Sequence, residues 1–353
     1  MKMAENILFQ CPYCRGGIDE STDHWCCGAC GRRFPVRQGV PFMNVGEQGA
    51  RGFIWARDSE AFLTRVEKEG WREALQSVQR PNSPNKLQEA LAPNRVSWSC
   101  LFEMNSSWKI LDIGAGTGGV ACQMATECFS VGLDKSWCDA VFMQLRAKQD
   151  NLLRFQAIVA DAISIPLDSN QFDLAVMIGS FEWIPSGWPS DKPRDVQVRA
   201  LKEVCRMLKP GGQFFLGIEN RKYLGYFIGI PEPHTDVKYI SLMDDDYADA
   251  LSWDVRGKPY LELTHSKDGY IELLKKAGFD QIQVFWLYPN YRLPNYIIPL
   301  DHVDTVRSFV EKHLDPRDFG GKEMLLYPLY RFLDSNVIPN YVRDFGFLAS
   351  RSL

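Results

Sequence analysis

The sequence lacks the features of a chain that spans a membrane, is secreted or grips nucleic acid. No apolar run approaches the roughly 18 residues that a membrane-spanning helix needs. The segment from Met1 to Asn6 lacks the apolar core of a signal peptide. The formal net charge of the 353 residues is −4, so no basic field favours nucleic acid or an anionic membrane. We expect a cytoplasmic protein for which nucleic acid is a poor partner.

The cysteines are present in a pattern that excludes a disulfide framework. Five of the ten fall between Cys11 and Cys30, and the others are scattered singly through apolar segments. A local cluster with isolated thiols elsewhere is typical of a metal site in a reducing compartment. A hydrophobic content of 45% and the chain length allow about two globular domains.

Two Cys-x-x-Cys pairs, separated by twelve residues, predict a zinc site. Four thiolates close a tetrahedral site of the structural kind, with no open position for catalysis. Cys26 lies beside one predicted ligand and is an alternative to it, and His24 is a weaker competitor. The predicted ligands are Cys11, Cys14, Cys27 and Cys30.

The zinc segment and the residues that follow it, Arg33 to Met43, resemble a known family. They are similar to the small zinc-binding activator proteins that dock on tRNA and release-factor methyltransferases. In that family the module is a separate subunit, whereas here it is fused to a longer chain. The resemblance leaves three roles open: bracing the enzyme, contacting substrate or mediating assembly. The near-neutral charge of the module argues against a tRNA-gripping ribbon.

The segment from Lys109 to Val120 predicts a nucleotide-type cofactor site. A short apolar run carrying Asp112 reads as a buried strand, and it is followed by a glycine-rich turn into a helix. Glycine permits unusual backbone dihedrals and close approach to a ligand. The helix start offers unpaired N–H groups and the positive end of a dipole. The spacing also fits the dinucleotide fingerprint, so it does not by itself choose the cofactor.

From Lys109 onward, strands and helices alternate, which predicts a parallel sheet covered by helices on both faces. Ligands of such sheets gather at the carboxyl ends of the strands. Upstream, residues 53–78 and 95–103 are expected to be helical. The predicted strands are 109–113, 129–133, 155–160, 172–178, 212–219 and 281–287, and the predicted helices fall near 118–127, 136–149, 192–208 and 267–277.

Acids at three consecutive strand ends decide the cofactor. Asp112 ends the first strand, Asp134 the second and Asp161 the third. They are suited to the amino group, the ribose hydroxyls and the adenine amino group of a nucleoside cofactor. S-adenosylmethionine has no pyrophosphate, and the sequence offers no second phosphate-binding device. It is therefore favoured over NAD.

The ordered motifs of this segment resemble those of class I S-adenosylmethionine-dependent methyltransferases over 109–219. That resemblance implies an α/β fold with a doubly wound, seven-stranded Rossmann-like sheet, whose seventh strand, beside the sixth, is 345–349. It also implies that the glycines line the methionyl portion, Asp134 the ribose, and Asp161 with Ala162 the adenine. The predicted cofactor residues are Asp112, Gly114, Ala115, Gly116, Gly118, Asp134, Lys135, Asp161, Ala162 and Gly179.

The methyl acceptor is expected near the end of the fourth strand. That position lacks the Asn/Asp-Pro-Pro-Tyr/Phe signature of nitrogen methylation, which argues against adenine or glutamine as acceptor. A polar insertion downstream carries His234, the first choice for a general base because imidazole titrates near working pH. A histidine beside prolines is otherwise a structural residue. Glu182, Glu219 and His265 are the alternative bases.

The segments Glu219-Asn-Arg and Pro231-Glu-Pro-His-Thr235, with 258–279, resemble methyltransferases of bacterial surface-polysaccharide and related pathways. The resemblance implies O-methylation of a saccharide or another small biosynthetic intermediate. The alternatives are an RNA or translation-protein methyltransferase and a non-catalytic scaffold, and a homo-oligomer is left open. We predict a zinc ribbon at 1–46, a linker and helical cap at 47–107, and a methyltransferase domain at 108–353 with insertions at 220–266 and 289–343.

Overall fold

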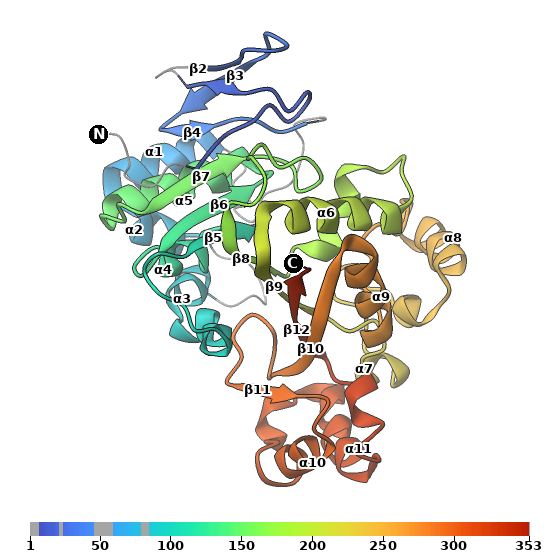
Figure 1. Ribbon diagram of the computed structural model, residues 1–353. Helices are drawn as coiled ribbons and strands as arrows, with labels where there is room; N and C mark the ends of the chain where they lie inside the picture. Colours follow the sequence, from blue (N-terminus) through green and yellow to red (C-terminus); the bar gives the residue numbers. More distant parts are fainter. Residues whose placement is uncertain (1–6, 21–23, 46–58, 79–84, 353) are drawn as a thin grey trace. The chain divides into compact units, whose positions relative to one another are not determined.

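The computed structural model describes residues 7–20, 24–45, 59–78 and 85–352, which divide into two compact units (Figure 1). The first unit comprises residues up to 178, together with 200–214 and the C-terminal end from 351. The second comprises 179–199 and 215–350. The predicted linker after residue 46 lies outside the described residues as far as residue 58.

A small antiparallel sheet forms the N-terminal ribbon of the first unit. Its apolar core includes Trp25, Phe34 and Met43. The ribbon is anchored to the rest of the unit by the backbone N–H of Met43, which donates to the carbonyl of Val159 at 2.7 Å. The strand order is β1 (Ile18–Asp19), β2 (His24–Cys27), β3 (Arg33–Arg37) and β4 (Val40–Pro41).

The next segment is helical, as predicted, but the helix expected over 53–78 is interrupted. Gly70 has a φ of +102°, a conformation outside the helical region, and a new helix begins after it. Residues 53–58 of that prediction lie outside the described residues. The helices are α1 (Ser59–Glu69), α2 (Trp71–Gln76) and α3 (Lys86–Leu91), followed by the 3-10 helix η1 (Pro93–Leu101).

The four strands predicted first form the parallel sheet of the first unit, in the order β8-β5-β6-β7. Apolar side chains of α1, α2 and α5 share a core with those of β7. The helix after the glycine turn is shorter than predicted at both ends, because residues 118–120 remain in the turn and residues 125–127 form another turn. The elements are β5 (Lys109–Ile113), α4 (Ala121–Met124), β6 (Phe129–Asp134), α5 (Trp137–Gln149), β7 (Phe155–Val159) and β8 (Phe172–Ile178).

The strands of the second unit follow the order β11-β10-β12, and β12 neighbours β9. The strand predicted at 345–349 lies within β12, beside the strand predicted at 281–287. The strand β11, antiparallel to β10, was not predicted. Strand β9 has residues in both units. The bounds are β9 (Leu208–Glu219), β10 (Phe279–Tyr288), β11 (Tyr296–Pro299) and β12 (Asp344–Arg351).

Both predicted insertions contain helices joined by loops. In the first insertion, Ile240, Tyr260 and Leu263 belong to a small core of its own. No helix among the described residues is long and apolar enough to cross a membrane. The remaining α-helices are α6 (Pro193–Met207), α7 (Leu224–Phe227), α8 (Asp245–Arg256), α9 (Lys267–Ala277), α10 (Val303–Lys312) and α11 (Leu326–Phe332). The remaining 3-10 helices are η2 (Phe181–Gly187), η3 (Ile240–Leu242), η4 (Pro316–Asp318), η5 (Gly321–Leu325) and η6 (Ile338–Asn340).

Candidate functional site

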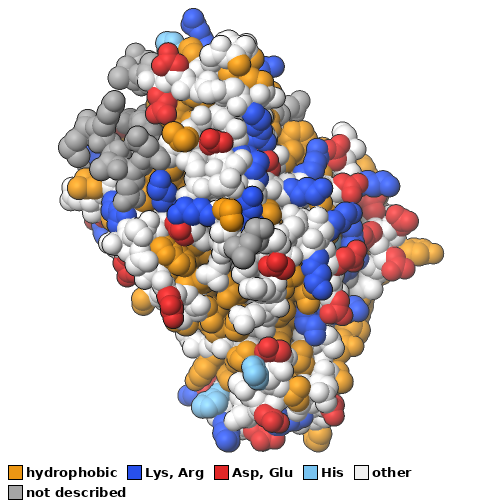
Figure 2. All heavy atoms as spheres, in the orientation of Figure 1, with side chains coloured by type: hydrophobic (Ala, Val, Ile, Leu, Met, Phe, Trp, Pro, Cys, Tyr) orange, Lys and Arg blue, Asp and Glu red, His pale blue; other side chains and the backbone are white. Residues whose placement is uncertain are grey.

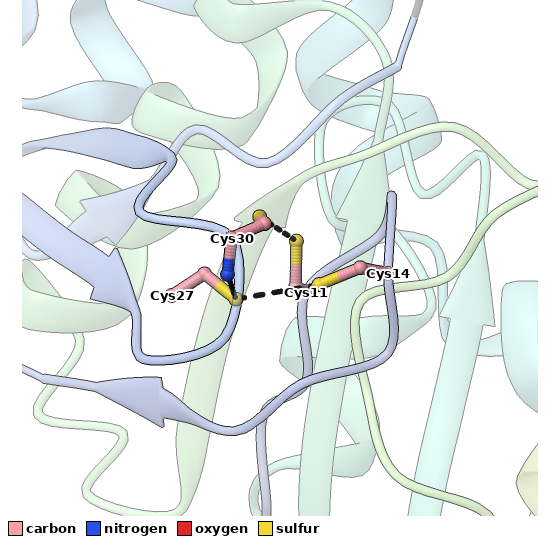
Figure 3. Close-up of side chains that lie close together, drawn as sticks. All are labelled: Cys11, Cys14, Cys27 and Cys30. Carbon is pink, nitrogen blue, oxygen red and sulfur yellow. Dashed lines mark hydrogen bonds between the residues drawn. The ribbon is translucent and has the colours of Figure 1, made fainter.

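The four predicted zinc ligands converge in the ribbon (Figure 3). The sulfur of Cys11 lies 3.7 Å from that of Cys30, and the sulfur of Cys14 lies 3.5 Å from that of Cys27. Tetrahedral zinc with Zn–S bonds of about 2.3 Å places its sulfurs about 3.8 Å apart, so the group fits the ion. The backbone N–H of Cys30 donates to the Cys27 sulfur at 3.4 Å, and this bond contributes to lowering the pKa of the Cys27 thiol to about 6. Cys26 is not part of the group.

The glycine turn after β5 has the backbone that the sequence predicted. Gly114, Gly116 and Gly118 have φ values of +72°, +54° and +71°, which L side chains rarely adopt. At Gly118 a Cβ atom would also lie 2.7 Å from the sulfur of Cys122. The N–H groups of Gly114 and Ala115 both donate to the carbonyl of one residue of β6, at 2.8 and 3.1 Å. The turn is therefore fixed against the neighbouring strand.

The first strand-end acid, Asp112, is buried with 3% of its surface exposed. One of its carboxylate oxygens accepts the N–H of Ala121, at the start of α4, at 3.0 Å. Burial raises the pKa of Asp112 to about 7, against the opposing charge of Arg95. Asp112 is thus a carboxyl group close to its titration point at neutral pH, and a cation nearby favours its ionised form.

The other two strand-end acids hold the loops around them. Asp134 accepts the N–H of Gly116 on one oxygen and that of Ser136 on the other, each at 2.8 Å. Burial raises the pKa of Asp134, and those backbone donors oppose the rise. Asp161 is paired with Lys135 at 2.9 Å. The carboxylate of Asp134 therefore links the glycine turn to the end of β6, and Ala162 follows Asp161 as a buried residue.

A buried arginine that sequence reasoning missed supports the glycine turn. Arg146, on α5, has 3% of its surface exposed. Its guanidinium donates to the carbonyls of Thr117 and Gly118, at 2.9 and 3.1 Å, and to that of Ala90 at 3.3 Å. It thereby ties α3 to the turn. The sequence carries no signal for this role, because Arg146 is one of two basic residues in the last turn of the helix.

The three predicted catalytic residues lie together in the second unit. Glu182 is in η2, Glu219 ends β9, and His234 belongs to the first insertion. The Nε2 atom of His234 is 3.5 Å from a Glu182 oxygen and 3.7 Å from a Glu219 oxygen. We call these three residues, with Glu232, the acid–histidine cluster. Glu182 is fully buried and Glu219 is 8% exposed.

Glu232 orients the histidine, a role that the sequence analysis did not assign. One oxygen of Glu232 hydrogen-bonds Nδ1 of His234. The other accepts the backbone N–H of His234 at 3.1 Å, and the N–H and hydroxyl of Thr235 at 2.9 and 2.8 Å. The Glu-Pro-His-Thr spacing is the signal for this arrangement, because such side-chain bonds to nearby backbone form local turns.

The carboxylates around His234 raise its pKa. Burial alone would lower that pKa, but the charges of Glu219, Glu182 and Glu232 outweigh burial and raise it well above the usual value. Burial and the charge of Glu182 raise the pKa of Glu219. The charge of Arg292 opposes the rise at Glu219, so the imidazole and the carboxylates of the cluster set one another's pKa.

The other residues predicted near the methyl acceptor or the cofactor lie either beside the cluster or in packed positions. The ring of Trp183 meets that of His234 edge-on, with centroids 5.0 Å apart. Gly179, the last predicted cofactor residue, belongs to the second unit, and a Cβ atom there would collide with the ring of Tyr291. His265 is buried, bonds Gln197 at 2.7 Å and has its pKa lowered to about 3 by burial. That alternative base is therefore a neutral residue of the core.

Comparison with known proteins identifies the class of this domain. Residues 111–216 match the family described as methyltransferase domain, a segment that contains the glycine turn and all three strand-end acids. The chain is 29% identical over 148 residues to an uncharacterized methyltransferase of Mycobacterium tuberculosis, over 37% of this chain and 55% of that protein. It is 28% identical over 140 residues to a ubiquinone biosynthesis O-methyltransferase of Pseudomonas putida, over 39% and 56%. The chain spans about half the length of these curated relatives.

Among solved structures, the chain is similar to phosphoethanolamine N-methyltransferase 2 of Haemonchus contortus in complex with S-adenosyl-L-methionine. The TM-score is 0.43 and the identity 18%, over 84% of this chain and 60% of that one.

Proposed function

We propose that the chain is an S-adenosylmethionine-dependent methyltransferase that methylates an oxygen of a saccharide or another small biosynthetic intermediate. One observation carries the proposal: a glycine turn with positive φ angles and three strand-end acids occur together within the matched methyltransferase segment. The carboxyl ends of adjacent parallel strands form the usual ligand-binding edge of an α/β sheet. The class of the curated relatives agrees with this chemistry.

The donor set fits the cofactor part by part. The turn from Gly114 to Gly118 would line the methionyl portion, with Asp112 facing its ammonium group. Asp134 accepts two backbone amides and keeps lone pairs for the ribose hydroxyls, because an ionised carboxylate offers about four acceptor positions. Lys135 adjoins it. Asp161 and Ala162 would meet the adenine, and Gly179 follows the end of β8.

S-adenosylmethionine supplies a methyl group that its sulfonium centre already activates. What remains for the protein is to align the acceptor, exclude water and remove the hydroxyl proton. We assign the proton-accepting role to the acid–histidine cluster. Glu219 is the last residue of β9 and Glu182 lies four residues beyond β8, so both follow strand ends. In the cluster without a bound ion, Nε2 of His234 is the first candidate base, with Nδ1 held by Glu232 as in a carboxylate–histidine dyad.

For the ribbon we propose a structural zinc ion bound by Cys11, Cys14, Cys27 and Cys30. The sulfur separations support it, and four thiolates leave no open coordination position.

Charge favours a small acceptor over RNA. On the face drawn in Figure 2, Lys and Arg side chains are interspersed with Asp and Glu side chains. Proteins that bind RNA through its phosphates concentrate positive charge on one surface instead. The net charge of −4 agrees.

Two measurements on the full chain test the proposal. Calorimetry should show S-adenosylmethionine binding that Asp134→Ala weakens and that Asp168→Ala, which removes an exposed acid of the same unit, leaves unchanged. A screen with labelled methyl groups should then give transfer to sugar nucleotides or glycolipids and none to total RNA. Absence of cofactor binding would leave the scaffold alternative, and transfer only to RNA would overturn the choice of acceptor.

A further inference from the structure

The acid–histidine cluster holds more negative than positive charge. Glu182, Glu219 and Glu232 contribute three carboxylates, and His234 contributes at most one positive charge. The side chains of Glu182, Glu232 and His234 are no more than 4% exposed, and that of Glu219 is 11% exposed. Buried charges are normally paired or coordinate a metal, because water no longer stabilises them. From outside the cluster, the charge of Arg292 lowers the pKa of Glu219, and the Nε of Arg292 donates to the hydroxyl of Tyr291 at 3.0 Å.

Within the cluster, three carboxylate oxygens accept no hydrogen bond from any described residue. Both oxygens of Glu182 and one of Glu219 are in this state. One Glu182 oxygen is directed at Nε2 of His234, at 3.5 Å. In contrast, Glu232 has a donor on each oxygen. A buried carboxylate without hydrogen bonds carries the full cost of desolvation, and a bound ion is one of the few arrangements that removes it.

The spacing of the candidate ligand atoms matches that of ligands around one ion. Nε2 of His234 and one oxygen each of Glu182 and Glu219 lie within 4.8 Å of one another. Metal–nitrogen and metal–oxygen bonds of about 2.0–2.2 Å place tetrahedral ligands about 3.4 Å apart. The two measured separations from Nε2 are 3.5 and 3.7 Å.

The histidine is already oriented as a metal ligand. A ligating histidine usually donates its other ring N–H to a carboxylate, which sets the tautomer and the ring direction. Glu232 provides that carboxylate at Nδ1, and its second oxygen is fixed by the backbone of His234 and Thr235. Nε2 is thereby left facing the two glutamates.

We propose that Glu182, Glu219 and His234 bind one divalent transition-metal cation, with Glu232 as the residue that positions His234. One imidazole and two carboxylates suit zinc, manganese, iron(II) or cobalt(II). Three protein ligands leave at least one coordination position for water or for a hydroxyl oxygen. Binding of the methyl acceptor through that oxygen rests on the proposed function, whereas the metal site itself does not.

The site is tested by manganese binding to the full chain, followed by electron paramagnetic resonance. Manganese(II) prefers carboxylate and imidazole over thiolate, so it reports on this cluster rather than on the ribbon. We expect one manganese ion per chain. Glu182→Gln and His234→Gln should each weaken its binding at least tenfold, and Glu232→Gln roughly 10- to 100-fold. Glu262→Gln, which removes a buried carboxylate of the same unit, should leave it unchanged.

Metal analysis and cofactor binding complete the experiment. After loading with zinc, the wild-type chain should hold two ions, the Glu182→Gln chain one and the Cys14→Ser chain one. Retention of wild-type manganese binding in Glu182→Gln and His234→Gln, or one zinc ion in the wild type, would overturn the site. S-adenosylmethionine binding by Glu182→Gln, measured by calorimetry, should be unchanged. If the wild type also fails to bind S-adenosylmethionine, that result counts against the proposed function and not against the metal site.

Discussion

The glycine turn in the first unit and the acid–histidine cluster in the second both gather carboxylates, yet they differ in how those carboxylates are satisfied. Around the turn, Asp112 and Asp134 accept backbone N–H groups, and Asp161 pairs with Lys135. In the cluster, Glu182 has neither oxygen hydrogen-bonded to a described residue. A polar site that its own backbone satisfies is preorganised for a ligand, whereas the cluster needs a partner to offset its charge.

The largest expected effect comes from the ribbon. Its four thiolates need a cation, and the acid–histidine cluster can be compared with them. Cys14→Ser should abolish zinc binding and unfold the ribbon, because binding of structural zinc contributes about 10–16 kcal/mol in zinc-finger peptides. Metal analysis and limited proteolysis measure this. Cys26→Ser is the matched control, since Cys26 lies outside the ligand group, and it should keep its zinc. Loss of zinc in both variants would mean that the ligand set is wrong.

Changes in the cluster should separate turnover from cofactor binding. We expect His234→Ala to lower the rate of methyl transfer by about 10²- to 10⁴-fold, the usual contribution of a proton-transfer group. The affinity for S-adenosylmethionine should be unchanged, and calorimetry with a methyl-transfer assay measures the two quantities. The Trp188→Phe chain is a nearby aromatic control, because that ring faces Arg199 rather than His234. Wild-type turnover in His234→Ala would exclude the role.

Substitutions of the strand-end acids should weaken cofactor binding and leave metal binding at the cluster unchanged. Asp134→Ala removes a charged acceptor of hydrogen bonds, each worth about 1.5–3 kcal/mol, so the dissociation constant of S-adenosylmethionine should rise about 10- to 150-fold. Manganese binding at the cluster should be unaffected. Asp112→Ala is expected to behave in the same way. If either variant bound the cofactor as tightly as the wild type, its assignment would fail.

The smallest expected effect is a pH dependence of cofactor affinity that originates in Asp112. Its pKa is raised to about 7 by burial, and the cofactor ammonium group favours the ionised form. Affinity should therefore rise as the pH rises toward 7, by up to about tenfold per unit, and level off above it. Asp112→Asn should bind S-adenosylmethionine more weakly, and its affinity should change less with pH. Calorimetry between pH 5.5 and pH 8.5, about one and a half units either side of the pKa of Asp112, can resolve this difference.

The raised pKa of Asp112 also makes the stability of the folded chain depend on pH. The folded pKa of Asp112 lies above the value of about 3.9 for an unfolded aspartate. At pH values between those two pKa values, Asp112 is ionised in the unfolded chain and protonated in the folded chain. The contribution of Asp112 to stability is therefore present at low pH and is lost as the pH rises from about 4 to about 7. Without cofactor, denaturant unfolding of the wild type and of Asp112→Asn should differ in this window.

Much of the first unit was predictable, because its signals are local. Strands β5 to β8 are apolar runs whose bounds agree with the prediction to within one residue. The interruption at Gly70 and strand β11 were not predicted, because each depends on contacts with another segment of the chain. Trp71, which begins the new helix, donates its backbone N–H to the side chain of Gln149 on α5, 78 residues away in sequence.

The sequence by itself determined the features that follow from residue spacing: two cysteine pairs that close one site, a glycine turn after a buried strand, and acids at consecutive strand ends. Only the tertiary structure decided that Glu182, Glu219 and His234 meet, and that both oxygens of Glu182 and one of Glu219 lack a hydrogen bond from the described residues. The physical reason is that spacing governs geometry over a few residues, whereas these residues come from η2, the end of β9 and an insertion. Their convergence and burial depend on how those segments pack.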